Sequence, residues 1–321
     1  MKTTMNQNHN QTRREFLRNA RLLATGAAIG SSAFGAPAAV PEGFRPLFDG
    51  ETLKGWTPKP RAQGAGPGKS AKGDKAGQAG GTDSFYQGAL KSCGRWAVQD
   101  GIIIGGQEPP GSGLGGYLVS DEAFGDFELL IDARPDWRAD TGVLVRTVPA
   151  GNVGFQVLLD HRPHGGIGGF YGNGLWNFHA WAYNFTAETD RDGRVVRLIP
   201  GKPEEPSKGN FTIPLDFAAP AETFLGIWKV NDWNQFRIRS VGALPRLTTW
   251  INGEKIAELD TAKIKAPGYT PQAVLEKIGR TGHIALEVHS NGLGDPLGQD
   301  RWAPGAVCRW RNIYIKPLPT E

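Results

Sequence analysis

The sequence contains little cysteine, few helix signals and no long apolar segment. Its 321 residues include only two cysteines, Cys93 and Cys308, so at most one disulfide can form, and their spacing alone does not establish it. No segment reaches the roughly 20 apolar residues of a membrane-spanning helix, so we expect no membrane span. No clear internal repeat is present, which excludes a repeat architecture.

The first 38 residues have the pattern of an export signal. Residues 12–18 (TRREFLR) precede a mildly apolar run over residues 22–34 and the small residues 36–38 (APA). Paired arginines ahead of a weakly apolar stretch and a small-residue cleavage site are typical of a twin-arginine signal peptide. We therefore expect residues 1–38 to be removed and the mature protein to be periplasmic or secreted.

The basic charge of the chain comes from segments outside the expected fold. Residues 1–38 hold five basic side chains and one acidic one, and this excess equals the net charge of +4 of the whole chain. A second group of lysines and arginines lies in a low-complexity stretch at residues 59–82. The mature chain is therefore close to neutral, and its charge gives no argument for nucleic-acid binding.

Glycine and proline are abundant, with 45 and 23 residues, and they favour many short strands and turns over helices. Four segments alternate apolar with mixed residues, at 127–132, 143–146, 155–160 and 284–289. Because successive side chains of a strand point to opposite faces, each strand has one apolar face that should pack against a second sheet. We predict an all-β sandwich of two antiparallel sheets, folded as one domain over residues 44–317.

Shorter signals fill in the rest of the chain. Two strands meet at an Asp100-Gly101 turn and two more at an Asn252-Gly253 turn, while further strands are expected at 235–240 and 306–316 and a helical turn at 271–277. Residues 59–82 cannot bury apolar area, which predicts a disordered insertion. Residues 162–217 form a long aromatic-rich excursion of the kind that serves binding.

An ordered set of motifs runs from about residue 44 to residue 316. It includes Leu47-Phe48-Asp49-Gly50, Gly125-Asp126-Phe127-Glu128-Leu129, Thr141-Gly142-Val143, Gly154-Phe155-Gln156-Val157, Trp250-Ile251-Asn252-Gly253, Gly282-His283-Ile284-Ala285-Leu286-Glu287 and Arg311-Asn312-Ile313. In this order the motifs resemble the bacterial 3-keto-disaccharide hydrolase family. The resemblance implies a concanavalin A-like jelly roll with a site on one concave sheet. It also implies action on glycosides that are already oxidised at the 3-position of the sugar.

The sequence departs from that family on the strands expected to carry the site. Gln156 stands where the family often has Glu, Leu158 where it usually has Gln, and Glu287 where it usually has Gln before x-His. A carboxylate has therefore moved across the groove, and a non-catalytic carbohydrate-binding module of the same fold is the alternative to an enzyme. The carboxylate pattern of retaining glucanases is absent, because Glu258-Leu259-Asp260 lacks its third carboxylate.

Cleavage beside a ketone at C3 needs three chemical groups. They are a base for the acidified hydrogen on C2, a cation or donor for the enolate oxygen, and an acid at the leaving oxygen. Glu287 and His289 are two residues apart on one predicted strand, so they point the same way, and Asp160 and Arg146 end the mixed faces of theirs. We predict His289 or Glu287 as the base, Asp160 as orienter or acid, and Arg146 at the oxyanion. The alternative is solvated surface charge, or a structural ion pair between Arg146 and Asp160.

Sugar binding requires flat rings that pack on C–H faces and polar groups beside them. The candidates for substrate binding are Gln156, His161, Tyr171, Trp176 and Trp181. The same region contains candidate ligands for a divalent metal, although no tight ligand spacing supports one: Asp160, His161, Glu287 and His289. No other cofactor is evident, the expected partner is a sugar or glycoside, and the oligomeric state is open.

Overall fold

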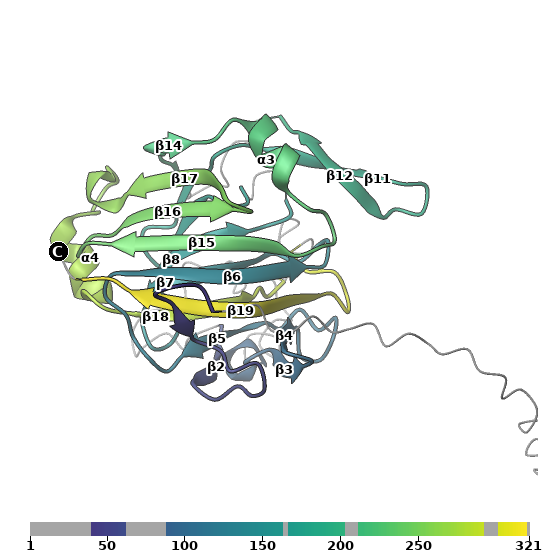
Figure 1. Cartoon of the computed structure of the whole chain (residues 1–321), viewed down its shortest axis with the longest axis horizontal. Helices are drawn as coiled ribbons and strands as arrows, with labels where there is room; N and C mark the ends of the chain where they lie inside the picture. Colours follow the sequence, from purple (N-terminus) through teal and green to yellow (C-terminus); the bar gives the residue numbers. More distant parts are fainter. Residues whose placement is uncertain (1–39, 62–87, 163–165, 203–210, 292–300, 320–321) are drawn as a thin grey trace, which may run out of the picture. The chain divides into compact units, whose positions relative to one another are not determined.

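The structure of the chain is a computed structural model (Figure 1). It describes residues 40–61, 88–162, 166–202, 211–291 and 301–319. The expected signal peptide lies outside these ranges, so its export function stays a prediction. Among the helices in the described ranges, none is long and apolar enough to cross a membrane.

Two large sheets make up the described part of the fold (Figure 1). One has nine strands: β14 (Phe217–Ala218), β17 (Glu254–Asp260), β16 (Arg246–Ile251), β15 (Asn234–Val241), β6 (Phe127–Pro135), β19 (Val307–Pro317), β4 (Ile102–Gly106) and β3 (Arg95–Gln99) in order, with β1 (Arg45–Pro46) paired to β19. The other has eight strands: β13 (Phe211–Thr212), β10 (Phe178–Ala180), β9 (Phe170–Asn173), β8 (Gly154–Leu159), β7 (Thr141–Thr147), β18 (His283–Val288), β5 (Gly116–Ser120) and β2 (Trp56–Pro60).

The strand order of the two sheets is that of a jelly roll. The chain passes from β6 in one sheet to β7 and β8 in the other, and β6 lies between β15 and β19 although these follow much later in the sequence. The described pairings of both sheets are antiparallel except that of β10 with β13. The predicted all-β sandwich is confirmed. Its smaller elements are β11 (Phe185–Thr189), β12 (Val195–Pro200), α3 (Ala221–Ile227), the 3-10 helix η2 (Thr261–Lys263) and α4 (Pro271–Ile278).

Alternating side chains build the core between the two sheets. Leu129 and Ile131 on β6 belong to the same buried apolar cluster as Val143 and Val145 on β7, and none of these side chains is exposed. Burial of each such side chain contributes about 1.5–3 kcal/mol. The period-two pattern therefore assigns one face of each strand to the core and leaves the other face free for a site.

The predicted tight turns form with the expected backbone. Asp100 and Gly101 have φ values of 50° and 77°, and Asn252 and Gly253 have values of 50° and 91°. Two-residue hairpins of this type need positive φ at both central positions, which Asn, Asp and Gly adopt at low cost. The predicted helical turn is α4, where the Thr270 hydroxyl caps the first turn by accepting from the Ala273 N–H at 3.1 Å.

The excursion at 162–217 contains more regular structure than predicted. Strands β9, β10 and β13 extend the eight-stranded sheet beyond β8, and β11 and β12 form a separate ribbon. These three added strands have four, three and two residues, too short to show an alternation in the sequence. Lys59 and Pro60, placed at the start of the insertion, are instead part of β2 and pair with β5. Residues 62–82 lie outside the described ranges, so their disorder stays a prediction.

The two cysteines are free thiols, so the alternative of a Cys93–Cys308 disulfide is not formed in this structure. Cys308 is fully buried on β19, and burial raises the pKa of its thiol well above the ordinary value. Burial also raises the pKa of Cys93. Neither thiol is therefore in the reactive thiolate form at neutral pH.

Arg146 occupies a place that the sequence pattern does not predict. A register shift in the pairing of β7 with β18 and a left-handed φ of 53° turn its side chain away from the outer face of the sheet. The guanidinium is 2% exposed and donates to a carboxylate oxygen of Asp126 at 2.7 Å and to the Gly242 carbonyl at 3.0 Å. The structure thus corrects the expectation that Arg146 binds an oxyanion, because the side chain is a buried structural one.

Removal of the Asp126 carboxylate should leave the buried Arg146 guanidinium without its counter-ion. We expect Asp126→Ala to lower the free energy of unfolding by about 3–5 kcal/mol, as found for broken buried ion pairs. Glu122→Ala, the matched control, removes the carboxylate of an exposed pair with Arg45 and should cost at most about 1 kcal/mol. Urea unfolding followed by tryptophan fluorescence measures both values, and equal losses would contradict the structural role of Arg146.

Candidate functional site

A dense group of charged side chains lies at one end of the strands of the eight-stranded sheet. Six members lie at or just beyond strand ends: Arg61 follows β2, Asp140 precedes β7, Asp160 and Arg162 follow β8, Glu287 lies on β18 and His289 follows it. The other two are Gln156, within β8, and Arg301, in the segment ahead of β19. The ends of β2, β8 and β18 and the start of β7 meet here because neighbouring strands run antiparallel. We refer to these eight residues as the charged cluster.

Glu287 has a partner for each of its two oxygens. Its Oε1 accepts from Arg61 Nε at 2.9 Å, and its Oε2 accepts from Gln156 Nε2 at 2.5 Å. The side chain is 1% exposed. Burial raises its pKa above the ordinary value, and the nearby Arg61 charge opposes this rise. Glu287 is therefore a desolvated carboxylate held by one cation and one amide.

Gly142 makes the contact between Gln156 and Glu287 sterically feasible. Their strands, β8 and β18, are not neighbours, because β7 runs between them. A Cβ atom built at Gly142 on β7 would lie 2.4 Å from Gln156 Nε2, well inside van der Waals contact. Glycine at this position lets the amide cross β7 and reach the carboxylate.

His289 presents an unprotonated ring nitrogen to two arginines. Its Nδ1 lies 2.6 Å from the Ser290 carbonyl oxygen, which can only accept, so Nδ1 carries the proton and Nε2 the lone pair. Nε2 lies 2.6 Å from Arg61 Nη2 and 3.2 Å from Arg301 Nη1. Burial, with the charges of these two arginines, lowers the pKa of His289 well below 6.5, so the ring is neutral at neutral pH.

Two aspartates hold the remaining cations of the cluster. Asp140 Oδ2 accepts from Arg301 Nη1 at 2.5 Å and from Arg162 Nη2 at 3.1 Å. Arg162 Nε also lies 2.9 Å from both oxygens of Asp160. Burial opposes ionisation of Asp160, but the Arg162 charge and its hydrogen bonds outweigh it and hold the pKa of this carboxyl well below its usual range. Asp160 is therefore ionised at neutral pH and holds Arg162 in place, while its role toward a substrate stays a prediction.

The structure brings four of the predicted site residues together: Gln156, Asp160, Glu287 and His289. His161 adjoins this group, because its ring packs edge-on against Trp137 at 5.8 Å and its Nδ1 lies 3.9 Å from Asp160. The side chain is 5% exposed, so His161 is buried beside Asp160. Within the described ranges, no group of three His, Cys, Asp or Glu side chains is arranged to hold a metal ion.

The predicted aromatic platforms separate into two places. Tyr171 pairs with Gln156 across β8 and β9, its ring lies 4.6 Å from His179, and His179 lies 4.7 Å from Trp181. These three rings form a row that starts beside the charged cluster. Trp176 instead lies at the turn between β9 and β10.

The surroundings of Trp176 separate it from the other predicted sugar platforms. Its ring contacts Tyr269 at 4.9 Å, and the Lys277 ammonium lies over it at 5.6 Å. Tyr269 itself belongs to the buried core. Trp176 therefore covers one end of the core next to α4 and does not belong to the row of rings beside the cluster.

Five residues of this region were not predicted: Arg61, Tyr117, Asp140, Arg162 and Arg301. Arg61 was hidden by the low-complexity composition that follows it. Tyr117 lies opposite Glu287 in the pairing of β5 with β18, and its hydroxyl accepts from Asn173 Nδ2 at 3.1 Å. Burial raises the pKa of Tyr117, so the hydroxyl stays protonated and can donate. Of these five, only Asp140 could have been identified from the sequence, because it directly precedes the Thr141-Gly142 motif.

Comparison with known proteins identifies the family. Residues 43–316 match the 3-keto-alpha-glucoside-1,2-lyase-like domain. The chain belongs to this family, which places it among the lyase-like and hydrolase-like carbohydrate-active proteins. A search of curated proteins gave no match.

Similar solved structures are distant and carry no functional argument. A candidate glycosyl hydrolase from Parabacteroides distasonis matches with 16% identity over 87% of this chain and 95% of its own, with a TM-score of 0.43. A carbohydrate-binding module from Bacillus subtilis has 10% identity over 70% of this chain and 91% of its own, with a TM-score of 0.37. A β-glucanase from Bacillus licheniformis has 10% identity over 70% and 82%, with a TM-score of 0.36.

The role of Gly142 can be tested directly. Gly142→Ala should displace the Gln156 amide, remove a hydrogen bond to a buried carboxylate worth about 1.5–3 kcal/mol, and raise the pKa of Glu287 further. Titration of the Glu287 carboxyl by carbon-13 NMR measures the shift. Gly125→Ala is the matched control, because the nearest atom to its added Cβ lies at 3.9 Å. An unchanged Glu287 pKa in Gly142→Ala would show that the amide does not depend on the glycine.

Proposed function

We propose that the protein cleaves glycosides that carry a ketone at C3, by removal of the C2 proton and elimination at C1. One observation supports this proposal above the others. The neutral His289 ring directs its Nε2 lone pair at two guanidinium groups inside a desolvated cluster. A base beside two cations is what formation of an enolate requires.

The proposed reaction begins with the ketone oxygen bound by Arg61 and Arg301, which turn from His289 to the substrate. The Nε2 atom of His289 then takes the proton from C2, and the electrons of that C–H bond form the enolate with its charge on the C3 oxygen. The enolate expels the aglycone oxygen from C1 and leaves a C1–C2 double bond. Addition of water to C1 completes hydrolysis, and release without water gives the lyase product.

The other cluster residues position these two arginines. Glu287 holds Arg61 through Nε, and Asp140 holds Arg301 through Nη1. Tyr117 is the candidate donor to the leaving oxygen, because it lies opposite Glu287 and keeps its proton. A carboxylate that fixes a guanidinium in this way lowers the cost of reorganisation during the reaction.

A carbohydrate-binding module without catalysis is the second candidate. The amide of Gln156, at a position where the family often has a carboxylate, favours it. Tight binding of 3-keto-glucosides with no turnover of any of them would support the module and contradict the enzyme.

We also propose that the protein acts after twin-arginine export, in the periplasm or outside the cell. The paired arginines Arg13 and Arg14 and the small residues that end the apolar run support this location.

Replacement of the proposed base should abolish most of the turnover. We expect His289→Ala to reduce kcat by at least about 10²-fold, since proton transfer by a positioned side chain contributes 10²–10⁴-fold. Added imidazole should restore part of the rate, and the hydrolysis product formed in D₂O should carry deuterium at C2, whereas a lyase product has no hydrogen on C2. His283→Ala, at the other end of the same strand, should retain full activity. Product that keeps its original C2 hydrogen would exclude the elimination route.

The acid limb of the pH profile should reflect the buried environment of His289. Because its pKa is lowered well below 6.5, the base stays unprotonated as the pH falls through 6.5. We therefore expect kcat/KM to be constant from pH 7 down past 6.5 and to fall only at more acidic pH. A stopped-flow or discontinuous assay across this range measures it. An acid limb at or above pH 6.5 would show that His289 is not the base in this environment.

A further inference from the structure

A hollow lies on the outer face of the nine-stranded sheet, away from the charged cluster. It has a volume of about 370 Å³, at the lower end of the range of about 300–1,000 Å³ for small-ligand sites. Glu128 and Leu130 on β6 alternate with the core residues Leu129 and Ile131, so they face outward into it. The charged cluster belongs to the eight-stranded sheet, and this hollow belongs to the nine-stranded sheet. We refer to it as the outer hollow.

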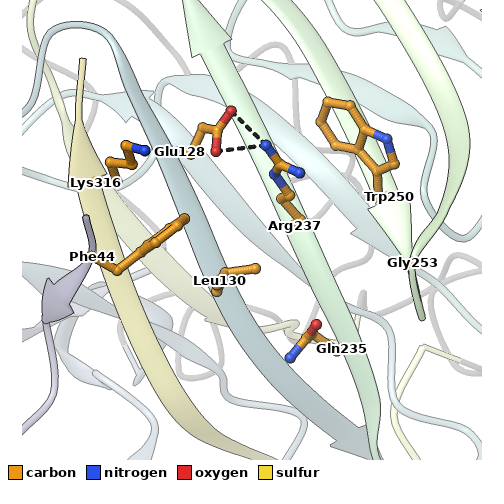
Figure 2. Close-up of a pocket in the computed structure, with 8 residues that line it drawn as sticks. All are labelled: Phe44, Glu128, Leu130, Gln235, Arg237, Trp250, Gly253 and Lys316. Atoms are coloured by element: carbon orange, nitrogen blue, oxygen red, sulfur yellow. Dashed lines mark hydrogen bonds and ion pairs between the residues drawn. The ribbon is translucent and has the colours of Figure 1, made fainter. Parts of the chain in front are cut away.

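The outer hollow has an apolar floor between two walls. Figure 2 shows Leu130 at the centre, the Phe44 ring on one side and Arg237 on the other. Arg237 is fixed in place, because it donates to both oxygens of Glu128 at 2.8 Å and its guanidinium lies 4.9 Å from the centre of the Trp250 ring. The shape is therefore set before a ligand binds, which lowers the entropic cost of binding.

Two polar groups on the rim make no side-chain hydrogen bond or ion pair within the described part of the chain, although one of them contacts an aromatic ring. Lys316 Nζ lies 5.9 Å from the centre of the Phe44 ring and makes no ion pair there. The Gln235 side-chain amide makes no hydrogen bond there, although its backbone N–H donates to Asn252. One cation, one amide donor and one amide acceptor thus point at a small apolar floor.

The charge around the outer hollow is positive. Glu128 is the carboxylate of the lining, and it is shared by Arg237 and by Arg239, whose Nε lies 3.9 Å from it. With Lys316, three cations face this one carboxylate. Such a surplus attracts an anion and leaves Lys316 as the group that can pair with it.

We propose that the outer hollow binds a saccharide that carries a carboxylate, such as a uronic acid residue. The carboxylate pairs with Lys316, the hydroxyl groups exchange hydrogen bonds with the Gln235 amide, and the C–H face of the sugar packs on Leu130 and Phe44. A purely apolar ligand would desolvate Lys316 and Gln235 without a partner. The proposal does not depend on the reaction at His289, because the two sites belong to different sheets.

Calorimetric titration with trigalacturonate at low ionic strength tests the proposal. We expect trigalacturonate to bind the wild type, and Lys316→Met and Gln235→Leu each to weaken it by about tenfold, near 1.4 kcal/mol. Lys265→Met, an exposed lysine elsewhere, should bind as the wild type does. His289→Ala should also keep its affinity, which separates this site from the charged cluster.

Several results would overturn the proposal. They are absence of trigalacturonate binding to the wild type, equal binding by Lys316→Met, or loss of binding in His289→Ala. Equal affinity for the neutral trisaccharide maltotriose would contradict recognition of the carboxylate. Tighter binding of a hexaglutamate peptide would assign the outer hollow to an acidic peptide in place of a saccharide.

Discussion

Pairing of buried charges at one end of the strands of the eight-stranded sheet is the interaction on which the candidate site depends. Three arginines and three carboxylates neutralise one another there, through contacts of Arg61 with Glu287 and of Asp140 with two further arginines. An unpaired buried ion costs several kcal/mol, so loss of one member would leave a costly unpaired charge on its partner. His289 is the exception, because it avoids the cost by remaining neutral. The same desolvation that forces the arginines to pair therefore leaves one base unprotonated among them.

The departure from the family pattern has a simple structural meaning. The resemblance to the family implies Glu at position 156 and Gln at position 287, so this chain carries the amide and the carboxylate on the opposite strands. The two side chains are hydrogen-bonded across β7, at 2.5 Å. The exchange therefore conserves an amide–carboxylate pair and the net charge of the site.

Most of the fold could be predicted from the sequence, and less of the site. Alternation over 127–132, 155–160 and 284–289 predicted which face of each central strand packs in the core, because burial of one face places an apolar residue at every second position. Local chemistry fixed the Asp100-Gly101 and Asn252-Gly253 turns. Arg146 could not be placed, because a register shift reverses the face of a single residue and leaves no mark in the sequence. Arg61 could not be found either, since its role depends on pairing with strands more than 200 residues away.

That separation in sequence has a consequence for how the protein becomes active. Arg61 and Glu287 are 226 residues apart, and Arg61 reaches its place only when β2 pairs at the outer edge of the sheet. Contacts of such high sequence separation form slowly and carry a large loop-closure cost. The imidazole of a partly assembled chain would lack its guanidinium neighbours and would bind a proton as an ordinary histidine does. The unprotonated state of His289 below pH 6.5 is thus a property of the completed chain, and a fragment or an unfinished fold would carry an ordinary, more basic imidazole.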